Sequence, residues 1–496
     1  MPEDSATPLR AATMPEFSGR VSAPTYDRSR ISTGIVHFGV GGFHRAHQAM
    51  YVDRLLERGL AHDWGICGVG VLPGDRRMRD VLAAQDGLYT LSTVGPDGTW
   101  ATRVIGSIVE YLYAPDDPEA VVEKLADPAT RIVSLTITEG GYRIAAGTGE
   151  FDADDPGVRA DLSGKAPPAT VFGFVTEALV RRRSRGVAPF TVLSCDNIEG
   201  NGHVARRMFG AFAALRDPEL GTWVAERVRF PNSMVDRITP VTPPAATGEI
   251  ERRYGITDRW PVVTEPFAQW VLEDTFELGR PAFDEVGVQL VDDVTPYELM
   301  KLRLLNAGHQ ALCYFGHLSG YRLVHEAAQD PAFRLFLLRY MDAEATPTLR
   351  EVPGVDLDRY KQTLLERFAN PAIGDTIARL CAESSDRIPK WLLPVIRAQL
   401  DSGGEIDCAA AVVASWARYA EGVDEQGAPI EVVDRLRDQL IPLARREREQ
   451  PTAFLGERSV FGDLIDRPRF VTAYRAALHS LHTKGAHATV EDLAQA

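Results

Sequence analysis

The sequence predicts an α/β protein in which a Rossmann-type N-terminal domain with a mostly parallel sheet is followed by an all-α C-terminal domain. Between residues 31 and 295, short runs rich in β-branched residues alternate with helical stretches, a pattern typical of a parallel sheet covered by helices. From residue 296 onward one helical stretch follows another, and almost no strand-like run remains. We therefore expect an N-terminal arm over 1–30, the α/β domain over 31–295 and the helical domain over 296–496.

The first strand and the first helix of the α/β domain are joined by a glycine-rich turn. Residues 35–40 form an apolar run long enough for a buried parallel strand, and apolar residues at helical spacing run from Ala46 to Leu56. A strand, a glycine turn and a helix in this order let the backbone approach a pyrophosphate that rests on the helix N-terminus. The residues expected to bind a dinucleotide here are Gly39, Val40, Gly41, Gly42 and Phe43.

The second expected strand ends near an acidic residue. Residues 64–71 form an apolar run, and Asp75 stands just beyond it. A carboxylate at this place can accept hydrogen bonds from the ribose hydroxyls of adenosine. The motif departs from the usual fingerprint because His44 occupies the position of the third glycine and Asp75 lies farther along the chain. We expect NAD as the cofactor and NADP as a weaker alternative, since Arg76 and Arg77 could partly neutralise a phosphate.

The remaining elements follow from the same kinds of pattern. Asp117 is a candidate N-cap and Pro118 a candidate first residue for a helix over 118–125. Residues 292–296 form the junction between the two domains. Further strands are expected at 131–138, 190–195 and 286–291, with a helix at 172–183. In the second domain, helices are expected at 297–315, 331–345, 356–369, 373–383, 388–401, 408–421, 430–447 and 468–481.

One stretch of the first helix after the junction gathers three polar side chains. On an α-helix, Asn306 lies about 140° and His309 about 80° around from Lys301, so the three share less than half of the circumference. The leucines between them offer apolar faces that could bury the helix. A lysine, an amide and an imidazole on one partly buried face can supply a base, an oxyanion donor and a ligand for a hydroxyl group. The spacing alone is also consistent with a solvated lysine, a capping asparagine and a buried histidine.

The composition limits the class of protein and its partners. The 496 residues carry a net charge of −15, which argues against nucleic acid or an anionic membrane surface as the main partner. The five cysteines are scattered without a C-x-x-C pair, so we expect reduced thiols and no metal site. No apolar run approaches the length of a membrane span, and the polar first 30 residues lack the core of a signal peptide. We expect a cytoplasmic protein, a monomer or small homo-oligomer, with a loose N-terminal arm.

Five motifs, in order along the chain, resemble the polyol-specific long-chain dehydrogenases. They are Gly-Val-Gly-Gly-Phe-His-Arg-Ala-His-Gln (39–48), Thr-Ile-Thr-Glu-Gly-Gly-Tyr (136–142), Ser-Cys-Asp-Asn (194–197), Met-Val-Asp-Arg-Ile-Thr-Pro (234–240) and Lys-x4-Asn-x2-His (301–309). The resemblance covers nearly the whole chain from about residue 25 to 480. It implies zinc-independent, NAD-dependent oxidation of D-mannitol or a related polyol to the ketose, and the reverse reduction.

The resemblance also implies roles for single residues. The lysine that matches Lys301 is the general base, and the asparagines that match Asn197 and Asn306 hold the reacting oxygen. The histidine that matches His309 helps to fix the substrate, and Glu139 matches a glutamate linked to proton movement. The positions expected to contact the polyol are Asp236, Arg379 and Arg387, the last of which is a lysine in a relative.

The chemistry of these side chains agrees with the implied roles. A lysine is a poor base at neutral pH because its amine is almost entirely protonated, so desolvation or a nearby cation must lower its pKa. Amide donors on the developing alkoxide contribute roughly 3–4 kcal/mol each in comparable sites. On an uninterrupted helix, Lys301 and His309 lie about 12 Å apart along the axis. His309 is therefore expected to hold another hydroxyl of an extended polyol, unless Gly308 breaks the helix.

Other interpretations of single motifs are weaker. Tyr297-x3-Lys301 mimics the Tyr/Lys pair of short-chain dehydrogenases, but the partner serine upstream is missing. His44-x2-His47 could be a metal pair, although histidines after a glycine loop are more often packing groups. Cys195 could be a nucleophile, but a buried strand cysteine is the commoner state.

Two alternatives concern the function as a whole. Arg379 and Arg387 could form the carboxylate clamp of a hexuronate (fructuronate or tagaturonate) reductase, and arabinitol or sorbitol could replace mannitol. A nucleotide-binding sensor without turnover is disfavoured because a pure binder has no need of a poised base.

Overall fold

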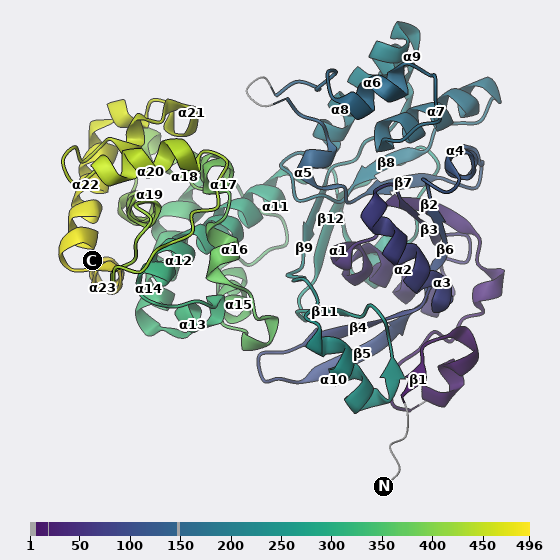
Figure 1. Ribbon diagram of the computed structural model, residues 1–496, viewed down its shortest axis with the longest axis horizontal. Coiled ribbons are helices and arrows are strands. Elements are labelled where there is room, and N and C mark those ends of the chain that lie inside the picture. The colour runs from purple at the N-terminus through teal and green to yellow at the C-terminus, as the bar shows by residue number, and fades with distance from the viewer. Residues whose placement is uncertain (1–5, 18, 146–148) are drawn as a thin grey trace. The chain divides into compact units, whose positions relative to one another are not determined.

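The computed structural model describes residues 6–17, 19–145 and 149–496 (Figure 1). The chain forms two compact units: the first extends to Val294 without Pro96–Gly98, and the second comprises Pro96–Gly98 and Thr295–Ala496. The first unit contains the sheets and the second is built from helices, which confirms the expected fold class. Among the described helices, none is long and apolar enough to span a bilayer.

Five parallel strands form the central sheet of the first unit, in the order β6-β3-β2-β7-β8. From β2 the chain builds the sheet first in one direction, through β3 and β6, and then in the other, through β7 and β8. The carboxyl ends of β2 and β7 therefore border the crevice in which such sheets bind ligands. The strands are β2 (Thr33–Phe38), β3 (Gly65–Gly70), β6 (Ile108–Tyr113), β7 (Ile132–Leu135) and β8 (Thr191–Ser194).

Helices cover both faces of this sheet because its strands are apolar on both sides. Ile35 packs in the cluster that includes α2 and α3, whereas Val36 and Phe38 pack in the cluster that includes α4, α7 and α8. The helices of the unit are α1 (Gly42–Ala46), α2 (Gln48–Glu57), α3 (Arg76–Ala84), α4 (Pro118–Ala126), α5 (Thr138–Gly141), α6 (Pro156–Leu162), α7 (Val171–Ser184), α8 (Asn201–Arg216), α9 (Pro218–Arg227) and α10 (Ala245–Tyr254). The expected N-cap of α4 is confirmed, since the Asp117 carboxylate accepts a bond from the Ala120 N–H at 3.0 Å.

Two smaller sheets have the orders β11-β4-β5 and β13-β12-β9, and each contains one antiparallel pair. Of their strands the sequence predicted only β13, within 286–291. The others were not anticipated, although the β4–β5 hairpin carries the alternating residues and the Gly-Pro-Asp-Gly turn typical of antiparallel pairs. The strands are β4 (Tyr89–Val94), β5 (Trp100–Ile105), β9 (Ser233–Asp236), β11 (Val262–Thr264), β12 (Gln269–Glu273) and β13 (Gln289–Val291).

The N-terminal segment is not the loose arm expected from its polarity. Its described residues include β1 (Thr7–Pro8), which pairs with β10 (Ile256–Thr257). Leu9 and Phe17 are fully buried in a cluster shared with the body of the first unit. A few apolar residues in a polar segment are therefore enough to anchor it.

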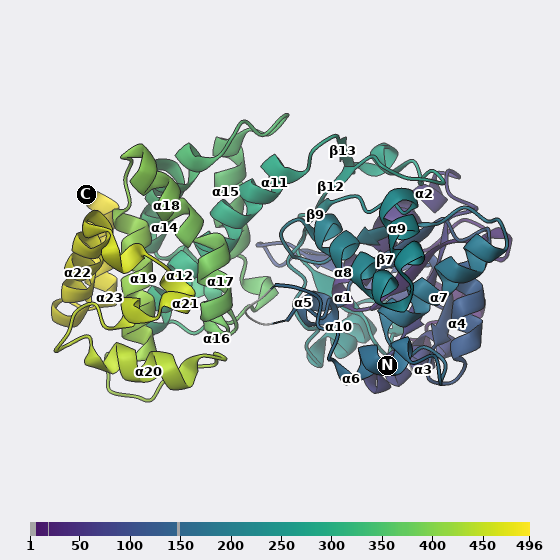
Figure 2. The ribbon, with the colours of Figure 1, turned by 90° about the horizontal axis from the view of Figure 1, so that it is seen from above.

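Helix α12 lies at the centre of the second unit (Figure 2). It packs against α13, α14, α16, α17, α19 and α23, and this position explains why apolar residues occur all around it. The helices are α11 (Thr295–Met300), α12 (Ala307–Leu318), α13 (Val324–Gln329), α14 (Pro331–Arg339), α15 (Leu357–Phe368), α16 (Ile377–Cys381), α17 (Ser384–Trp391), α18 (Leu393–Ser402), α19 (Asp407–Ala420), α20 (Arg437–Arg446), α21 (Arg458–Phe461), α22 (Pro468–Thr483) and α23 (Ala486–Gln495). Two π-helical turns, at Lys301–Asn306 and Tyr340–Ala345, interrupt the α-helical geometry.

Candidate active site

A pocket of about 580 Å³ opens in the first unit at the carboxyl ends of β2 and β7. All of the residues expected to bind a dinucleotide line it, from the glycine turn to the acidic residue after β3. Its wall is completed by the loop after β7, the start of α7 and the segment after β9. The lining residues are 38–43, Arg45, Val71, Leu72, Gly74, Asp75, Met78, 136–138, Gly141, Arg143, 169–172, 239–242 and Trp260.

The three glycines of the turn serve two different purposes. Gly39 has φ +91°, and a Cβ there would lie 2.1 Å from the Thr136 carbonyl oxygen, so only glycine fits this close approach of β2 to β7. A Cβ at Gly41 or Gly42 would meet nothing nearer than 3.9 and 3.7 Å, respectively. The backbone of these two residues is therefore accessible from the pocket, as close contact with a pyrophosphate requires.

The departure at His44 from the usual glycine fingerprint has a packing explanation. The third glycine normally allows a helix to lie close against its strand. Here the buried His44 ring stacks on His37 of β2 with centroids 3.4 Å apart and planes 13° apart. His37 in turn contacts the hydroxyls of Ser134 at 2.8 Å and Thr136 at 2.9 Å. Burial lowers the pKa of His37 to about 3 and that of His44 well below its usual range, so the stack is uncharged at neutral pH.

The alternatives for His47 and Cys195 find no support in the geometry. The His47 Nε2 lies 3.1 Å from the Gln269 carbonyl oxygen, and its ring packs against Trp270. Within the described residues, no group of three or more histidine, cysteine, aspartate or glutamate side chains could hold a metal ion. Cys195 is buried, and this burial raises the pKa of its thiol far above the usual range. A protonated buried thiol is a poor nucleophile.

Asp75 is fixed by the turn that follows β3. Its Oδ2 accepts hydrogen bonds from the backbone N–H groups of Val71 at 2.9 Å and Leu72 at 2.8 Å. The half-buried carboxylate is thereby held in the wall of the pocket. An acidic residue at this position can accept hydrogen bonds from ribose hydroxyls.

The two arginines after Asp75 are held in different places. The Arg76 guanidinium lies 5.4 Å from the centre of the Tyr113 ring and forms a 3.8 Å ion pair with Asp116. The Arg77 guanidinium lies 4.2 Å from the centre of the Trp260 ring, and Trp260 lines the pocket. Of the two, Arg77 is therefore the cation that the structure associates with the pocket wall.

Glu139 and Asn197 are exposed on the loops that follow β7 and β8, and Glu139 belongs to the one-turn helix α5 within the first of these loops. A buried carboxylate, Asp196, joins these loops, because it accepts hydrogen bonds from the Thr138 N–H and the Tyr142 hydroxyl, both at 2.8 Å. The sequence reasoning gave neither Asp196 nor Tyr142 a role. The available signal was their presence in the motifs that contain Glu139 and Asn197.

The other polar candidates of the site are distributed over both units. Asp236 is the last residue of β9 in the first unit and is buried. In the second unit, the Arg379 Nε donates to Asp375 at 2.6 Å. Arg387 of α17 donates to the carbonyl oxygens of Arg379 and Leu380, both at 3.0 Å. The structure thus brings Arg379 and Arg387 together, and Asp375 neutralises part of the charge of Arg379.

Lys301 and Asn306 lie on a π-helical turn rather than on the α-helix assumed from the sequence. The N–H of Ala307, the residue after the turn, bonds to the carbonyl of Leu302, five residues back. Because a π turn closes over five residues instead of four, side chains five apart lie nearer to one face than in an α-helix. Lys301 and Asn306 are five apart, so the expected separation of about 140° is too large. The helix does not break at Gly308, which lies inside α12.

The π turn is supported by contacts from elsewhere in the second unit. The buried Tyr340 hydroxyl donates to the Arg303 carbonyl at 3.0 Å, and the Arg303 side chain donates to the Thr348 carbonyl at 2.6 Å. Lys301 and Asn306 are buried, and His309, 9% exposed, packs its ring 4.3 Å from that of Phe368. The expectation that leucines bury this face agrees with the burial of Leu302, Leu304 and Leu305.

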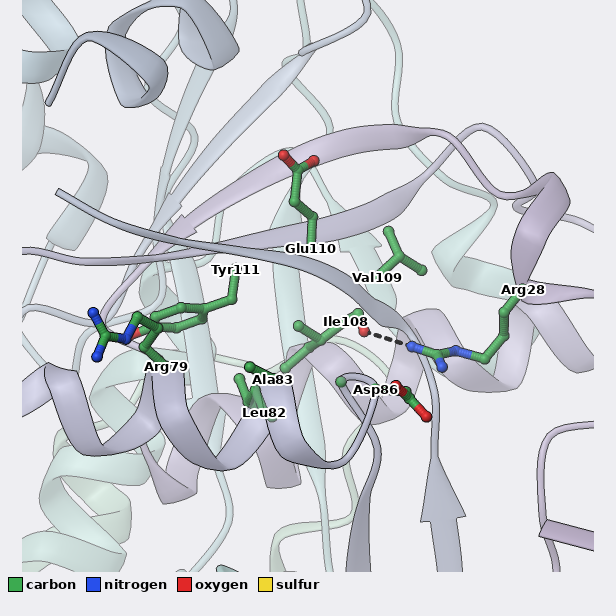
Figure 3. A pocket seen from close by; sticks show the side chains of 10 residues that line it. Arg28, Arg79, Leu82, Ala83, Asp86, Ile108, Val109, Glu110 and Tyr111 are labelled. Atoms are coloured by element: carbon green, nitrogen blue, oxygen red, sulfur yellow. Dashed lines mark hydrogen bonds between the residues drawn. The ribbon is translucent and has the colours of Figure 1, made fainter. Parts of the chain in front are cut away.

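A second cavity of about 400 Å³ lies beside α3 and β6 in the first unit (Figure 3). The charged side chains Arg28, Arg79 and Glu110 that line it form hydrogen bonds or ion pairs with other residues of the first unit. Arg28 donates to the carbonyl oxygens of Gly106 and Ile108, both at 2.9 Å. Arg79 pairs with Asp80 and Asp116, and Glu110 pairs with Lys124. This cavity is therefore structural, and the pocket at the glycine turn is the candidate site.

Comparisons with known proteins agree with this division of the chain. The mannitol dehydrogenase Rossmann domain model matches residues 33–285, and the mannitol dehydrogenase C-terminal domain model matches residues 293–482. The chain is 47% identical over 478 residues to mannitol 2-dehydrogenase of Phaeosphaeria nodorum, covering 96% of this chain and 84% of that protein.

Two solved structures are similar over the whole chain. One is Pseudomonas fluorescens mannitol 2-dehydrogenase in a ternary complex with NAD and D-mannitol, at 46% identity and TM-score 0.88, covering 99% of this chain and 100% of that one. The other is a substrate-free D-sorbitol dehydrogenase at 40% identity and TM-score 0.90, covering 98% of this chain and 100% of that one.

Proposed function

Because this chain belongs to the mannitol dehydrogenase family, we propose that it catalyses the NAD-dependent oxidation of D-mannitol, or of a closely related polyol, to the ketose, and the reverse reduction. The observation that carries the proposal is the 46% identity, over 99% of the chain, to an enzyme crystallised with NAD and D-mannitol. It agrees with the polyol dehydrogenase resemblance of the five sequence motifs.

The first unit supplies the cofactor site. NAD fits the residues present, because Gly41 and Gly42 leave the backbone open to the pocket and Asp75 offers a fixed carboxylate. When bound, NAD supplies the hydride acceptor for alcohol oxidation. Asp75 favours NAD because its carboxylate accepts hydrogen bonds from the ribose hydroxyls and would repel a 2′-phosphate. The Arg77 guanidinium beside Trp260 could partly neutralise that phosphate and so allows weaker use of NADP.

We assign the proton chemistry to Lys301 and Asn306 of the second unit and to Asn197 and Glu139 of the first unit. Lys301 removes the hydroxyl proton of the polyol in oxidation and returns it to the carbonyl oxygen in reduction. The amides of Asn306 and Asn197 donate to the reacting oxygen and stabilise its negative charge. His309 holds a further hydroxyl of the polyol, and Glu139 takes part in moving the proton to solvent. No step in this scheme uses a zinc ion.

Polyol contacts come from Asp236, Arg379 and Arg387. A hexuronate as substrate is less well supported, because the Arg379 guanidinium is already paired with Asp375 and is not a committed clamp for a second carboxylate. Sorbitol is the better second candidate, since a D-sorbitol dehydrogenase is 40% identical over 98% of this chain.

The test measures turnover with a panel of substrates, followed through the absorbance of NADH. The purified protein is mixed with NAD and mannitol, sorbitol or arabinitol, and separately with NADH and fructose or fructuronate. We expect the highest kcat/KM with mannitol and fructose. A higher value for fructuronate, or no turnover with any polyol, would reject the proposal.

The absence of a zinc requirement is tested on the same assay. Dialysis against a strong chelator should leave kcat unchanged, because the proposed groups stabilise the alkoxide without a Lewis acid. Loss of turnover that added zinc restores would overturn the lysine mechanism.

A further inference from the structure

Asp196 connects the loops that follow β7 and β8. Its carboxylate is 6% exposed and accepts hydrogen bonds from the Thr138 N–H at 2.8 Å, the Ile137 N–H at 3.2 Å and the Tyr142 hydroxyl at 2.8 Å. Three donors on one buried carboxylate make a strong anchor, because hydrogen bonds to a charged group exceed neutral ones in strength.

The loop after β7 needs such an anchor because its backbone is strained. Thr138 has φ +62°, in the left-handed region that β-branched residues avoid. This conformation is energetically unfavourable and persists only where the surroundings hold it. Glu139 follows directly, so the direction of its side chain depends on the backbone angles that Asp196 stabilises.

Tyr142 fixes Asp196 from the interior of the first unit. The tyrosine is fully buried, and its hydroxyl lies 2.6 Å from Ser194 Oγ at the end of β8. Burial raises the pKa of Asp196, and the bonds from Tyr142 and Thr138 oppose this rise. The carboxylate is thus tied on one side to the sheet and on the other to the strained loop.

We propose that Asp196, held by Tyr142, is a positioning residue that sets Glu139 and Asn197 in their working geometry. The inference rests on the function proposed above, which assigns Glu139 to proton movement and Asn197 to the reacting oxygen. Each of these two residues is the chain neighbour of one end of the Thr138–Asp196 hydrogen bond. One buried bond therefore controls two functional side chains on different loops.

Loss of the anchor should reduce turnover more than cofactor binding. Asp196→Asn replaces one acceptor oxygen by an amide that faces backbone donors, so Thr138 should relax toward ordinary backbone angles. A misplacement of about 1 Å of functional groups costs about 100-fold in rate. We expect Asp196→Asn to lower kcat by about 100-fold and Tyr142→Phe by about tenfold, with the Kd of NADH changed less than about threefold.

The first unit contains a matched control. Asp53 is also a buried carboxylate that accepts a tyrosine hydroxyl, from Tyr26 at 2.6 Å, and a backbone N–H, from Gly106 at 2.9 Å, and it forms an ion pair with Arg103 in addition. It anchors the N-terminal segment and has no proposed part in the reaction. Asp53→Asn and Tyr26→Phe should therefore lower the melting temperature while leaving kcat unchanged.

The experiment measures kcat, its pH profile, NADH binding and thermal melting for these four variants, and for Glu139→Gln and Asn197→Ala as references. The pH profile of Asp196→Asn should change in the same direction as that of Glu139→Gln. Asp196→Asn should lower kcat by a much smaller factor in the Glu139→Gln background than in the wild type, because the effects of residues that act as one unit are not additive. If Asp196→Asn fails to fold, the comparison of kcat between Tyr142→Phe and Tyr26→Phe tests the inference.

Two results would overturn the inference alone: normal kcat in Asp196→Asn and Tyr142→Phe while the reference variants are impaired, or equal losses of kcat in the Asp53 and Asp196 variants. Normal activity of Glu139→Gln and Asn197→Ala would instead refute the roles assigned to these residues, and the inference with them.

Discussion

The glycine turn of the first unit and the π turn of the second both depart from regular backbone geometry, but for different reasons. Gly39 has φ +91°, and a Cβ at this residue would lie 2.1 Å from the Thr136 carbonyl oxygen. The residue type itself therefore dictates the shape of the turn. The π turn at Lys301–Asn306 contains leucines and an arginine that favour an ordinary α-helix. Its shape is stabilised by contacts such as that from Tyr340 to the Arg303 carbonyl.

The difference shows which kind of geometry a sequence can reveal. A turn that depends on glycine leaves a local signature, whereas a turn held by distant side chains leaves none. The two regions also differ in their proposed chemistry, since we assign backbone groups of the glycine turn to cofactor binding and side chains of the π turn to the reacting oxygen. Substitutions in the two regions should therefore affect different kinetic constants.

The largest effect is expected from Lys301→Ala in the π turn. We expect kcat to fall by about 10³-fold or more, with the Kd of NADH unchanged, because the lysine acts only on the reacting hydroxyl. In the wild type, oxidation should accelerate as pH rises, since a larger fraction of the amine is deprotonated. Steady-state kinetics and NADH fluorescence test both points, and retention of more than about a tenth of the rate would exclude Lys301 as the base.

In the glycine turn the effects should appear first in cofactor binding. Gly41→Ala should leave the melting temperature unchanged and raise the Kd of NADH at least about tenfold, because its Cβ enters space that the pyrophosphate needs. Gly39→Ala should weaken binding and also destabilise the fold by about 1–3 kcal/mol. Gly210→Ala in α8, where a Cβ meets nothing within 4 Å, is the control. Equal NADH affinity in Gly41→Ala and the wild type would place the pyrophosphate elsewhere.

Tyr340→Phe tests whether distant contacts hold the π turn. Loss of the hydroxyl leaves the partly buried Arg303 carbonyl without this donor and should cost about 1–3 kcal/mol of stability. If the turn then relaxes toward α-helical geometry, Lys301 and Asn306 move apart and kcat should fall about tenfold. Tyr321→Phe removes a 2.7 Å hydrogen bond to Asp330 in the same unit and should leave kcat intact. A similar kcat in both variants would show that the π turn does not depend on Tyr340.

A smaller change is expected in cofactor preference. Asp75→Ala should raise kcat/KM for NADP and lower it for NAD, each by about tenfold, because one ribose contact and one repulsive charge are lost. Arg77→Ala should reduce the activity with NADP, while Arg76→Ala, whose side chain pairs with Asp116, should not. If Asp75→Ala shifts neither value, the ribose end of the pocket does not lie at Asp75.

The smallest effect on turnover should come from Glu344, whose carboxylate binds backbone N–H groups at the start of α19. Burial raises the pKa of Glu344 to about 7, although it accepts bonds from the N–H groups of Cys408 and Ala409. Its folded pKa thus lies above the unfolded value of 4.5, so the folded state binds the proton more tightly. The free energy of unfolding should decline as pH rises from about 4.5 to 7, by on the order of 1–3 kcal/mol.

Chemical denaturation at a series of pH values measures this decline. Glu344→Gln should flatten it without changing kcat. Glu326→Gln, which removes an exposed carboxylate of the same unit, should not flatten it. An unchanged pH dependence in Glu344→Gln would assign the decline to other groups, among them Glu447, whose pKa burial also raises to about 7.

Much of the fold was predictable because periodicity and turn residues are local properties. The parallel strands at the glycine turn, α4 with its Asp117 cap, and most helices of the second unit follow from such patterns. The short strands β9, β11 and β12 escaped prediction because their pairing depends on partners far along the chain. The burial of Leu9 and Phe17 escaped for the same reason, since nothing in the N-terminal segment itself indicates its binding site on β10.

The site residues divide in the same way. Gly39, Gly41 and Asp75 were recognisable because each type of residue has a specific task near a dinucleotide. Asp196 and Tyr142 were not, because a buried carboxylate that accepts three hydrogen bonds looks like any other aspartate in sequence. The relation of Lys301 to Asn306 was misjudged because the spacing was interpreted with α-helical angles.

The π turn also affects how this chain can tolerate a change in length. A π turn contains one more residue than the α turn that could replace it, so deletion of a single residue between Lys301 and Asn306 would restore an unbroken α-helix from α11 to α12. The lysine and the asparagine would then be four residues apart, or about 40° around an α-helix, so they would still share one face. A one-residue deletion in the π turn should thus disturb the fold less than a deletion inside α12, which would rotate the following core residues by about 100°.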